Sequence, residues 1–463
     1  MPFTIVILWT DALLWLLVLA IALYGWHCRR QAHLAAPWAR VFRSPAGVGS
    51  MVVLACYLAV GLADSMHFRQ QLDRQKPGAE IAYASEVLSV LDLAAAHLRG
   101  RSEKTYSAPL ATRLYSKEQI ETPDGKHLRA YPRLRFGGAH LKDEAGRDTD
   151  IATTALAALA AAVVVLTVLW FATAPLRRRL PDVPWQAGFA ALCAIVVVAF
   201  PAIALSGGYH VLGTDRVGQD ILYLSLKSVR TSIVIGTVTT LIMLPLGVAL
   251  GIMAGYFKGW IDDVIQYLYT TLNSIPGVLL IAASVLMLQV LLDRFSDLFP
   301  TAAQRGDMRL LALCAILGLT SWTGLARLLR GEALKLSQME YIQAAHAFGV
   351  AHARILSRHI LPNVSHIVII ALVMDFSGLV LAEAVLSYVG VGVDPSTTSF
   401  GTMINAARLE MAREPMVWWS LASAFLFMLV LVLAANLLAD AVRDGFDPRF
   451  RAARSFPLAV RKA

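Results

Sequence analysis

Long apolar stretches constrain this chain more than any other feature of its sequence. Hydrophobic residues make up 57% of its 463 residues, and charged residues make up only 16%. A run of about 20 mostly apolar residues is long enough to cross the hydrocarbon core of a bilayer as a helix. We therefore expect an all-α membrane protein with nine spans, at residues 5–26, 47–63, 151–174, 185–205, 231–257, 264–292, 310–329, 364–389 and 417–441.

The basic residues predict how these spans are oriented. When the loop after the first span is placed in the cytoplasm, the cytoplasmic segments carry more than twice as many Lys and Arg as the short outer segments. Short loops rich in Lys and Arg stay on the cytoplasmic side, so we expect the N-terminus outside and the C-terminus inside a bacterial inner membrane. The formal net charge of +9 then reflects basic residues beside anionic lipid headgroups, and it does not indicate nucleic-acid binding.

The spans divide the chain into four segments. Residues 1–63 hold two spans, residues 64–150 form a hydrophilic insert on the outer side, residues 151–184 hold the third span and a basic cytoplasmic loop, and residues 185–463 hold six spans. Within the insert, apolar residues at helical spacing predict a helix over 80–98, and turn residues follow it. The sequence leaves two interpretations of the insert open: a small lid or docking surface, and a partly ordered linker.

A polar, helix-compatible segment separates the seventh and eighth predicted spans, within residues 330–363. Its alanine side chains are small enough for another protein to approach closely, and Gly349 is expected to end the helix. Pro362 is expected to stop the next helix before the chain re-enters the membrane. Two interpretations of this segment therefore stay open: a docking surface, or an ordinary surface helix made of good helix formers and ended by a glycine cap. The residues concerned are Gln343, Ala344, Ala345, Gly349, Leu361 and Pro362.

The spacing of this segment resembles the coupling loop of ABC importer permeases. In that loop Glu-Ala-Ala, three residues, Gly, nine residues and Ile-x-Leu-Pro dock onto the ATPase subunit. Here Gln343 replaces the Glu and His359 replaces the Ile, while the other motif positions are in register. The resemblance implies that separate ATPase subunits drive this chain through the loop.

Residues 210–222 resemble the Leu-Gly-Thr-Asp-x-x-Gly-Arg-Asp element of dipeptide and oligopeptide importer permeases, with Gln219 in place of the Arg. A glycine permits the tight turn, and the threonine or the first aspartate can cap the helix that follows. The second aspartate can bond to backbone or to a basic neighbour. An ordinary capped interfacial helix explains the same residues taken singly. The positions of this outer motif are Gly213, Thr214, Asp215, Gly218 and Asp220.

A third element, residues 383–403, resembles the Glu-Ala-x-Leu-Ser-Phe-Leu-Gly-Leu-Gly stretch of the same permeases. Its two glycines are expected to interrupt the eighth span, and irregular backbone survives at membrane depth only where protein buries it or it lines a cavity. Two carboxylates also lie in this span, where charges are costly. They either face the transport path or make structural hydrogen bonds between helices. The candidates for the path are Asp375, Glu383, Gly390, Gly392 and Pro395.

The sequence indicates neither an enzyme nor a metal site. Four histidines lie in or just beyond the loop between the seventh and eighth predicted spans: His346, His352, His359 and His366. They are six or seven residues apart, so they lack the i, i+4 pairing of a helical metal site, and the four cysteines form no CxxC motif. The chain contains no G-x-x-x-x-G-K-[ST] loop, no G-x-S-x-G elbow and no H-E-x-x-H helix. We expect no catalytic residue, metal or cofactor in this chain.

The resemblances together imply a six-span ABC importer permease core preceded by three extra spans with an extracytoplasmic insert. They imply the C-type permease subunit of a bacterial peptide importer, with a second permease as heterodimer partner, two ATP-binding subunits and an extracytoplasmic solute-binding protein. Two alternatives stay open. One is a membrane sensor or assembly scaffold in which the insert is the working part; the other is an ion-driven carrier that uses Asp375 and Glu383.

Overall fold

The computed structural model describes residues 3–71, 83–121, 127–294, 301–394 and 397–446. Within these residues, eight helices are long and apolar enough to cross a membrane, which confirms an all-α membrane protein. They are α1 (Trp9–Arg30), α3 (Pro45–Asp64), α6 (Arg147–Ala172), α8 (Trp185–Ser206), α9 (Ile221–Phe257), α12 (Ala302–Leu336), α15 (Leu361–Val389) and α17 (Trp419–Phe446).

The sixth predicted span is bent rather than continuous. Helices α10 (Gly259–Ser274) and α11 (Gly277–Arg294) meet at 88°, and they make a ninth span only if the pair is counted as one. Pro276 has no amide hydrogen, and its ring disfavours the helical conformation in the residue before it. Ile275 is accordingly extended, with φ −90° and ψ 132°. The span at 264–292 is therefore broken between Ser274 and Gly277.

The chain forms two compact units. The first contains residues 1–11, 48–233 and 383–434, and the second contains residues 12–47, 234–382 and 435–463. The shorter elements of the first unit are β1 (Phe3–Val6), β2 (His67–Gln70), β3 (Leu88–Ser89), α4 (Val90–Ala94), α5 (Ala96–Arg99), β4 (Glu118–Glu121), β5 (His127–Ala130), η1 (Glu144–Gly146), α7 (Ala174–Arg179) and α16 (Phe400–Glu410). Those of the second unit are α2 (Ala32–Val41), α13 (Glu340–Ala347), α14 (His352–Ile355) and η3 (Leu356–Ile360).

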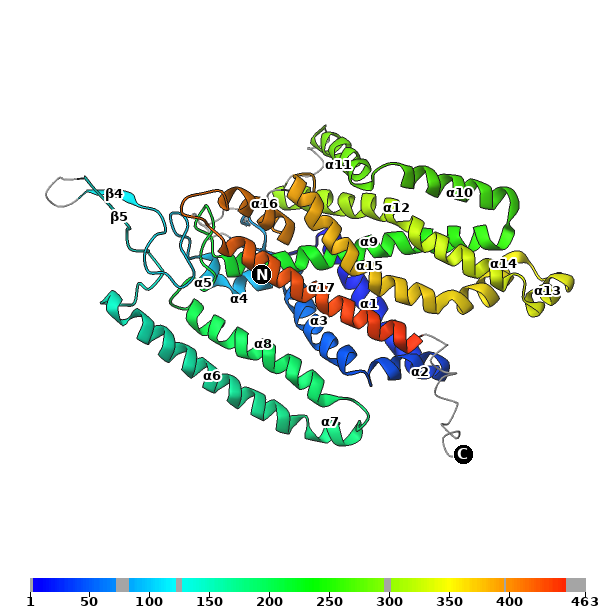
Figure 1. The fold of residues 1–463 in the computed structure, drawn as a ribbon, viewed down its shortest axis with the longest axis horizontal. Helices are drawn as coiled ribbons and strands as arrows, with labels where there is room; N and C mark the ends of the chain where they lie inside the picture. The colour runs from blue at the N-terminus through cyan, green and yellow to red at the C-terminus, as the bar shows by residue number, and fades with distance from the viewer. Residues whose placement is uncertain (1–2, 72–82, 122–126, 295–300, 395–396, 447–463) are drawn as a thin grey trace, which may run out of the picture. The chain divides into compact units, whose positions relative to one another are not determined.

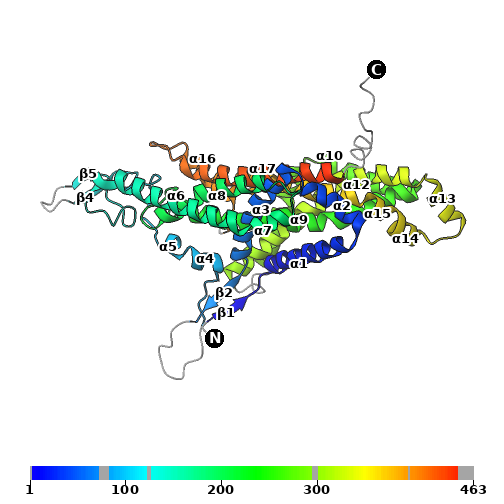
Figure 2. The ribbon, with the colours of Figure 1, turned by 90° about the horizontal axis from the view of Figure 1, so that it is seen from below.

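The described part of the insert is folded, as Figure 2 shows at β2, α4 and α5. Strands β1, β2 and β3 form an antiparallel sheet in that order, and β4 pairs with β5 in a separate two-stranded sheet. The prediction of one helix over 80–98 is wrong, because the only helices that the described residues from 83 onward form there are the short α4 and α5. Ser89 and Asp92 form a reciprocal capping box, which starts a helix at Val90 and ends the strand before it.

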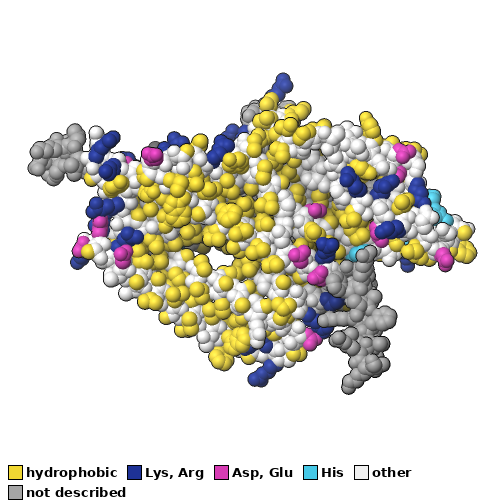
Figure 3. All heavy atoms as spheres, viewed as in Figure 1, with side chains coloured by type: hydrophobic (Ala, Val, Ile, Leu, Met, Phe, Trp, Pro, Cys, Tyr) yellow, Lys and Arg dark blue, Asp and Glu magenta, His cyan; other side chains and the backbone are white. Residues whose placement is uncertain are grey.

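Helices α6 and α8 lie side by side within the first unit, joined through α7 (Figure 1). Hydrophobic side chains cover their exposed surface in the space-filling view (Figure 3). Val163, Phe171 and Val198 are each at least 60% exposed. An apolar surface of this kind suits contact with lipid tails rather than with water.

In the second unit, α9 and α12 approach each other closely at a row of glycines. A Cβ added to Gly251 would lie 2.6 Å from the carbonyl oxygen of Ala326, and one added to Gly247 would lie 3.0 Å from the Leu325 side chain. Gly255, one turn further along, would press a Cβ against the Arg330 carbonyl oxygen. Small residues four apart allow helix backbones to approach in membranes, so this row fixes the contact between the two helices.

Candidate functional site

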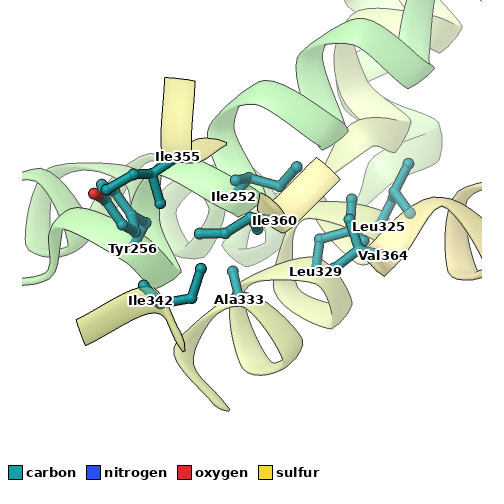
Figure 4. Close-up of a cluster of buried hydrophobic side chains, with 9 residues drawn as sticks. All are labelled: Ile252, Tyr256, Leu325, Leu329, Ala333, Ile342, Ile355, Ile360 and Val364. Carbon is teal, nitrogen blue, oxygen red and sulfur yellow. The ribbon is translucent and has the colours of Figure 1, made fainter. Parts of the chain in front are cut away.

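One face of the predicted coupling loop is buried in the second unit. Ile342 of α13, Ile355 of α14 and Ile360 of η3 are each 0% exposed. They pack into a cluster contributed by α9, α12 and α15 (Figure 4). Burying a side chain of this size stabilises the packed state by about 1.5–3 kcal/mol. The loop is therefore held against three long helices. The other members of the cluster are Ile252, Tyr256, Leu325, Leu329, Ala333 and Val364.

The other face of the loop is exposed. Ala345 is half-buried against the cluster, while the other motif residues lie on the surface. Phe348, which precedes the motif glycine, is 86% exposed. A large apolar side chain held out at the end of a helix is a typical protein contact point. The exposed motif residues are Gln343, Ala344, Gly349, Leu361 and Pro362.

Backbone conformation explains the glycine of the loop, whereas the proline acts differently from the prediction. Gly349 has φ +72°, and a Cβ there would meet no atom within 4 Å. Its role is therefore the left-handed turn that ends α13. Pro362 lies in the first turn of α15, directly after η3, where a missing amide hydrogen costs no helix bond. The prediction that Pro362 stops the preceding helix is wrong.

Tyr256 connects α9 to both sides of the loop. Its hydroxyl lies 2.8 Å from Nε2 of His346 and 2.9 Å from Nδ1 of His352, and its ring stacks on His346 at an interplanar angle of 14°. Within the described residues no group of three His, Cys, Asp or Glu side chains could hold a metal ion. These histidines position the loop helices relative to α9.

The outer motif is held in the first unit by backbone of the insert. Thr214 is fully buried; its hydroxyl oxygen accepts a hydrogen bond from the Ser107 amide at 2.7 Å, and its carbonyl accepts one from Nε1 of Trp419 at 3.0 Å. Gly213 and Gly218 both have φ +77°. A Cβ on Gly213 would lie 2.5 Å from the Ser107 carbonyl oxygen, and one on Gly218 would overlap the backbone of Glu103. These glycines make room for the insert.

Asp220 is the residue that caps α9. Its Oδ1 accepts from the Leu222 amide at 2.8 Å, which satisfies one of the free amides of the first turn. Asp215 instead accepts from the amides of Val217 and Gln219 and closes the preceding turn. The prediction that Thr214 or Asp215 caps the helix is therefore wrong.

His210, Glu103 and Asp220 form a buried charge cluster. Nδ1 of His210 lies 2.8 Å from Oδ2 of Asp220, and Nε2 forms a 3.5 Å ion pair with Glu103, beyond hydrogen-bond distance for a good bond. The Glu103 carboxylate also accepts the amides of Arg135, Phe136 and Gly137. Burial raises the pKa of Glu103, but the attraction of His210 and the hydrogen bonds from these amides outweigh burial and lower this pKa to about 2.

Glu383 is buried and hydrogen-bonded near the end of α15. It is 1% exposed, and its Oε1 accepts from Oγ of Ser387 at 2.6 Å and from Oγ of Ser399 at 2.9 Å. Gly390 has φ +89° and follows the last residue of α15, so it ends the helix. A Cβ on Gly392 would overlap Ser387, so this glycine permits the chain to fold back against α15.

The two remaining path candidates, Asp375 and Pro395, are not among the partners of Glu383. Asp375 is half-buried on α15, and no described residue is hydrogen-bonded or ion-paired to its carboxylate. Pro395 lies outside the described residues. The structure therefore assigns Glu383 and the two glycines to the end of α15 and leaves Asp375 as the carboxylate without a structural partner among the described residues.

Comparison with known proteins places these elements in a family. The profile of binding-protein-dependent transport system inner membrane components matches residues 247–452, which include the coupling loop. The oligopeptide transport system permease protein OppC of Mycobacterium tuberculosis (strain ATCC 25618 / H37Rv) is 32% identical over 248 residues, covering 54% of this chain and 79% of that protein. The chain belongs to the peptide ABC importer permeases.

Two further relatives agree with this assignment. The glutathione transport system permease protein GsiD of Pectobacterium atrosepticum is 33% identical over 244 residues, covering 52% of this chain and 73% of that protein. The dipeptide transport system permease protein DppC of Lactococcus lactis is 30% identical over 240 residues, covering 52% of this chain and 64% of that protein. This permease is thus a transport subunit rather than an enzyme, and it is a multi-pass protein of the inner membrane.

Proposed function

We propose that separate ATPase subunits drive this permease by docking on the exposed face of its coupling loop. The observation that carries the proposal is the two-sided loop. Its buried isoleucines lock it to α9, α12 and α15, while Ala344 and Phe348 remain exposed. Packed interiors transmit displacement because they are dense and nearly incompressible. A force on the exposed face therefore moves the long helices.

The partners follow from this arrangement and from the family. The permease pairs with a second permease, two ATPases bind on the cytoplasmic side, and an extracytoplasmic protein delivers peptides. ATP binding favours the closed ATPase dimer, which opens the path outward through the loop, and hydrolysis resets the path inward. In this orientation the N-terminus, the insert 64–150 and the outer motif face outward, and the C-terminus lies in the cytoplasm. The domain division at 63, 150 and 184 belongs to the same proposal.

Phe348→Asp tests the docking surface. Because the side chain is exposed, the substitution should leave the chain folded, yet it places an unpaired charge in a desolvated contact, which costs several kcal/mol. We expect the purified importer to lose its ATPase subunits and ATP-driven uptake to fall at least tenfold. Leu93→Asp is the matched control, since Leu93 is 52% exposed in the insert and should leave both properties unchanged.

Two outcomes would contradict the proposal. If Phe348→Asp retains ATPase association and uptake, the docking assignment is wrong and the scaffold alternative gains support. If uptake persists with hydrolysis-deficient ATPases but stops when the ion gradient is collapsed, and Asp375→Asn abolishes it, the protein is an ion-driven carrier.

A further inference from the structure

A cavity of about 490 Å³ lies in the first unit. It is bounded by the outer motif, by α16 and the segment before it, and by Tyr106 of the insert. Cavities of 300–1,000 Å³ are the usual size for small-molecule sites. Hydroxyl groups and four charged side chains line it, and two of these, Arg216 and Arg413, are exposed at the surface.

Glu410 is the buried charged group of this cavity. It is 5% exposed, and Oε1 accepts a hydrogen bond from the Tyr106 hydroxyl at 3.0 Å. Oε2 has no hydrogen-bond partner among the described residues. Leaving a buried polar atom without a partner is unfavourable, and more so when the atom is charged. A ligand that donates a hydrogen bond and brings a positive charge would remove this cost.

The second carboxylate of the cavity, Asp215, already accepts hydrogen bonds from the protein backbone. Oδ1 of Asp215 accepts two backbone amides within its own turn, so Asp215 serves the turn. Burial, together with the nearby Asp215 charge, raises the pKa of Glu410 above its ordinary value, although the Tyr106 hydroxyl and the two arginines oppose this shift. A bound cation beside this carboxylate would favour its ionised form.

The two arginines supply the opposite charge. Neither Arg216 nor Arg413 forms an ion pair with a described residue. Arg413 lies over the Tyr106 ring, with 5.1 Å between Cζ and the ring centroid. Both guanidinium groups act electrostatically on the same Tyr106–Glu410 pair. The cavity thus offers a free anionic oxygen inside and free cationic donors at its opening.

We infer that this cavity binds a small zwitterionic solute, with its protonated amine on Glu410 and its carboxylate on Arg216 and Arg413. The two ends of a short peptide have this chemistry. The inference deepens the proposed function, on which its transport role rests: the permease itself would recognise the free termini of the peptide. In the proposed orientation the cavity faces the side from which the solute arrives.

Binding of dialanine to the purified full-length chain tests the site directly, without ATPase subunits. Isothermal titration or saturation-transfer NMR should detect dialanine, and N-acetyl-dialanine and dialanine amide should each bind at least tenfold more weakly. Glu410→Gln should remove the preference for the free amine, and Arg413→Gln should reduce the preference for the free carboxylate. Arg408→Gln is the matched control, because Arg408 lies on α16 with Glu410 but its guanidinium lies over the Tyr388 ring.

A further variant blocks the cavity without removing a charged side chain, so it tests the site independently of the Glu410 and Arg413 substitutions. Ala406 lines the cavity and is exposed, so Ala406→Trp should fill the space and block dialanine without changing any charge. The inference is wrong if dialanine does not bind, if blocked and free termini bind equally, or if Glu410→Gln keeps the amine preference. Binding that persists in a complex with no ATP-driven uptake would contradict the coupling proposal and leave this site intact.

Discussion

His210 makes contact between the insert and the outer motif sensitive to pH. Burial alone would lower the pKa of His210, but its hydrogen bond to Asp220 and its ion pair with Glu103 outweigh burial and raise that pKa from 6.5 to about 9. A group whose pKa is raised on folding stabilises the folded state fully below its unfolded pKa. This stabilisation is lost as the pH rises from 6.5 through about 9.

The size of the effect follows from the shift. Each pKa unit corresponds to about 1.4 kcal/mol, so the rise in the pKa of His210 from 6.5 to about 9 is worth about 3 kcal/mol between pH 6 and pH 9.5. Glu103 acts at the other end of the range: its lowered pKa of about 2 gives stability that is present above 4.5 and lost on acidification. The contact should therefore be most stable between about pH 4.5 and pH 6.5.

Hydrogen exchange at two amides measures this contact. The Glu103 amide donates to the Gly218 carbonyl at 2.9 Å, and the Ser107 amide donates to the Thr214 hydroxyl. After correction for intrinsic exchange, we expect their opening free energy to fall by about 3 kcal/mol between pH 6 and pH 9.5. In His210→Gln it should be low at both pH values, because the titrating group is absent.

His97→Gln provides the control for this experiment. His97 also lies in the insert region, but its ring contacts the Ser206 hydroxyl rather than a carboxylate, so the wild-type pH dependence should persist. The reasoning is refuted if wild-type protection does not change between pH 6 and pH 9.5, or if His210→Gln retains the same slope.

Two further predictions concern the coupling loop and the topology. Tyr256→Phe removes the hydroxyl bonded to His346 and His352, so we expect several-fold less peptide uptake per ATP hydrolysed in the reconstituted importer. Tyr267→Phe is the control, because Tyr267 is 72% exposed and its substitution should not change that ratio. An unchanged ratio in Tyr256→Phe would exclude a positioning role for Tyr256. In a chain without native cysteines, an impermeant thiol reagent outside intact cells should label Ser102→Cys and not Ser337→Cys, and the opposite pattern would invert the proposed orientation.

The spans were predictable because a helix in a membrane must be apolar along its whole length. All of the predicted windows except 264–292 fall on long apolar helices. The exception contains Pro276, and whether a proline kinks a helix or splits it depends on neighbouring packing that periodicity does not encode. The glycine row at Gly247, Gly251 and Gly255 was visible in the sequence at a spacing of four, although its partner α12 was not.

The site was only partly predictable, because its key contacts join distant residues. The outer motif was recognised, but Glu103 lies more than a hundred residues away from it, and no local pattern connects the two. The local sequence predicts Thr214 or Asp215 as the helix cap for the same reason, whereas insert backbone occupies the Thr214 hydroxyl and Asp215 closes its own turn. In the coupling loop, the spacing of the histidines bears only on metal binding, and no local pattern connects His346 and His352 to Tyr256 on another helix.

The contacts of α9 argue against an insert that works as a detachable sensor. Lys227 lies 2.8 Å from Asp64 and 3.0 Å from Asp92, and Arg230 pairs with Asp11 at 2.5 Å, all within the first unit. These carboxylates come from the N-terminal spans and the insert, and each is at most 5% exposed. Removing one partner of a buried pair leaves an uncompensated charge and costs about 3–5 kcal/mol. Deleting the extra segments would therefore expose the start of α9 to that cost, so they stabilise the helix that carries the outer motif at one end and Tyr256 near the other.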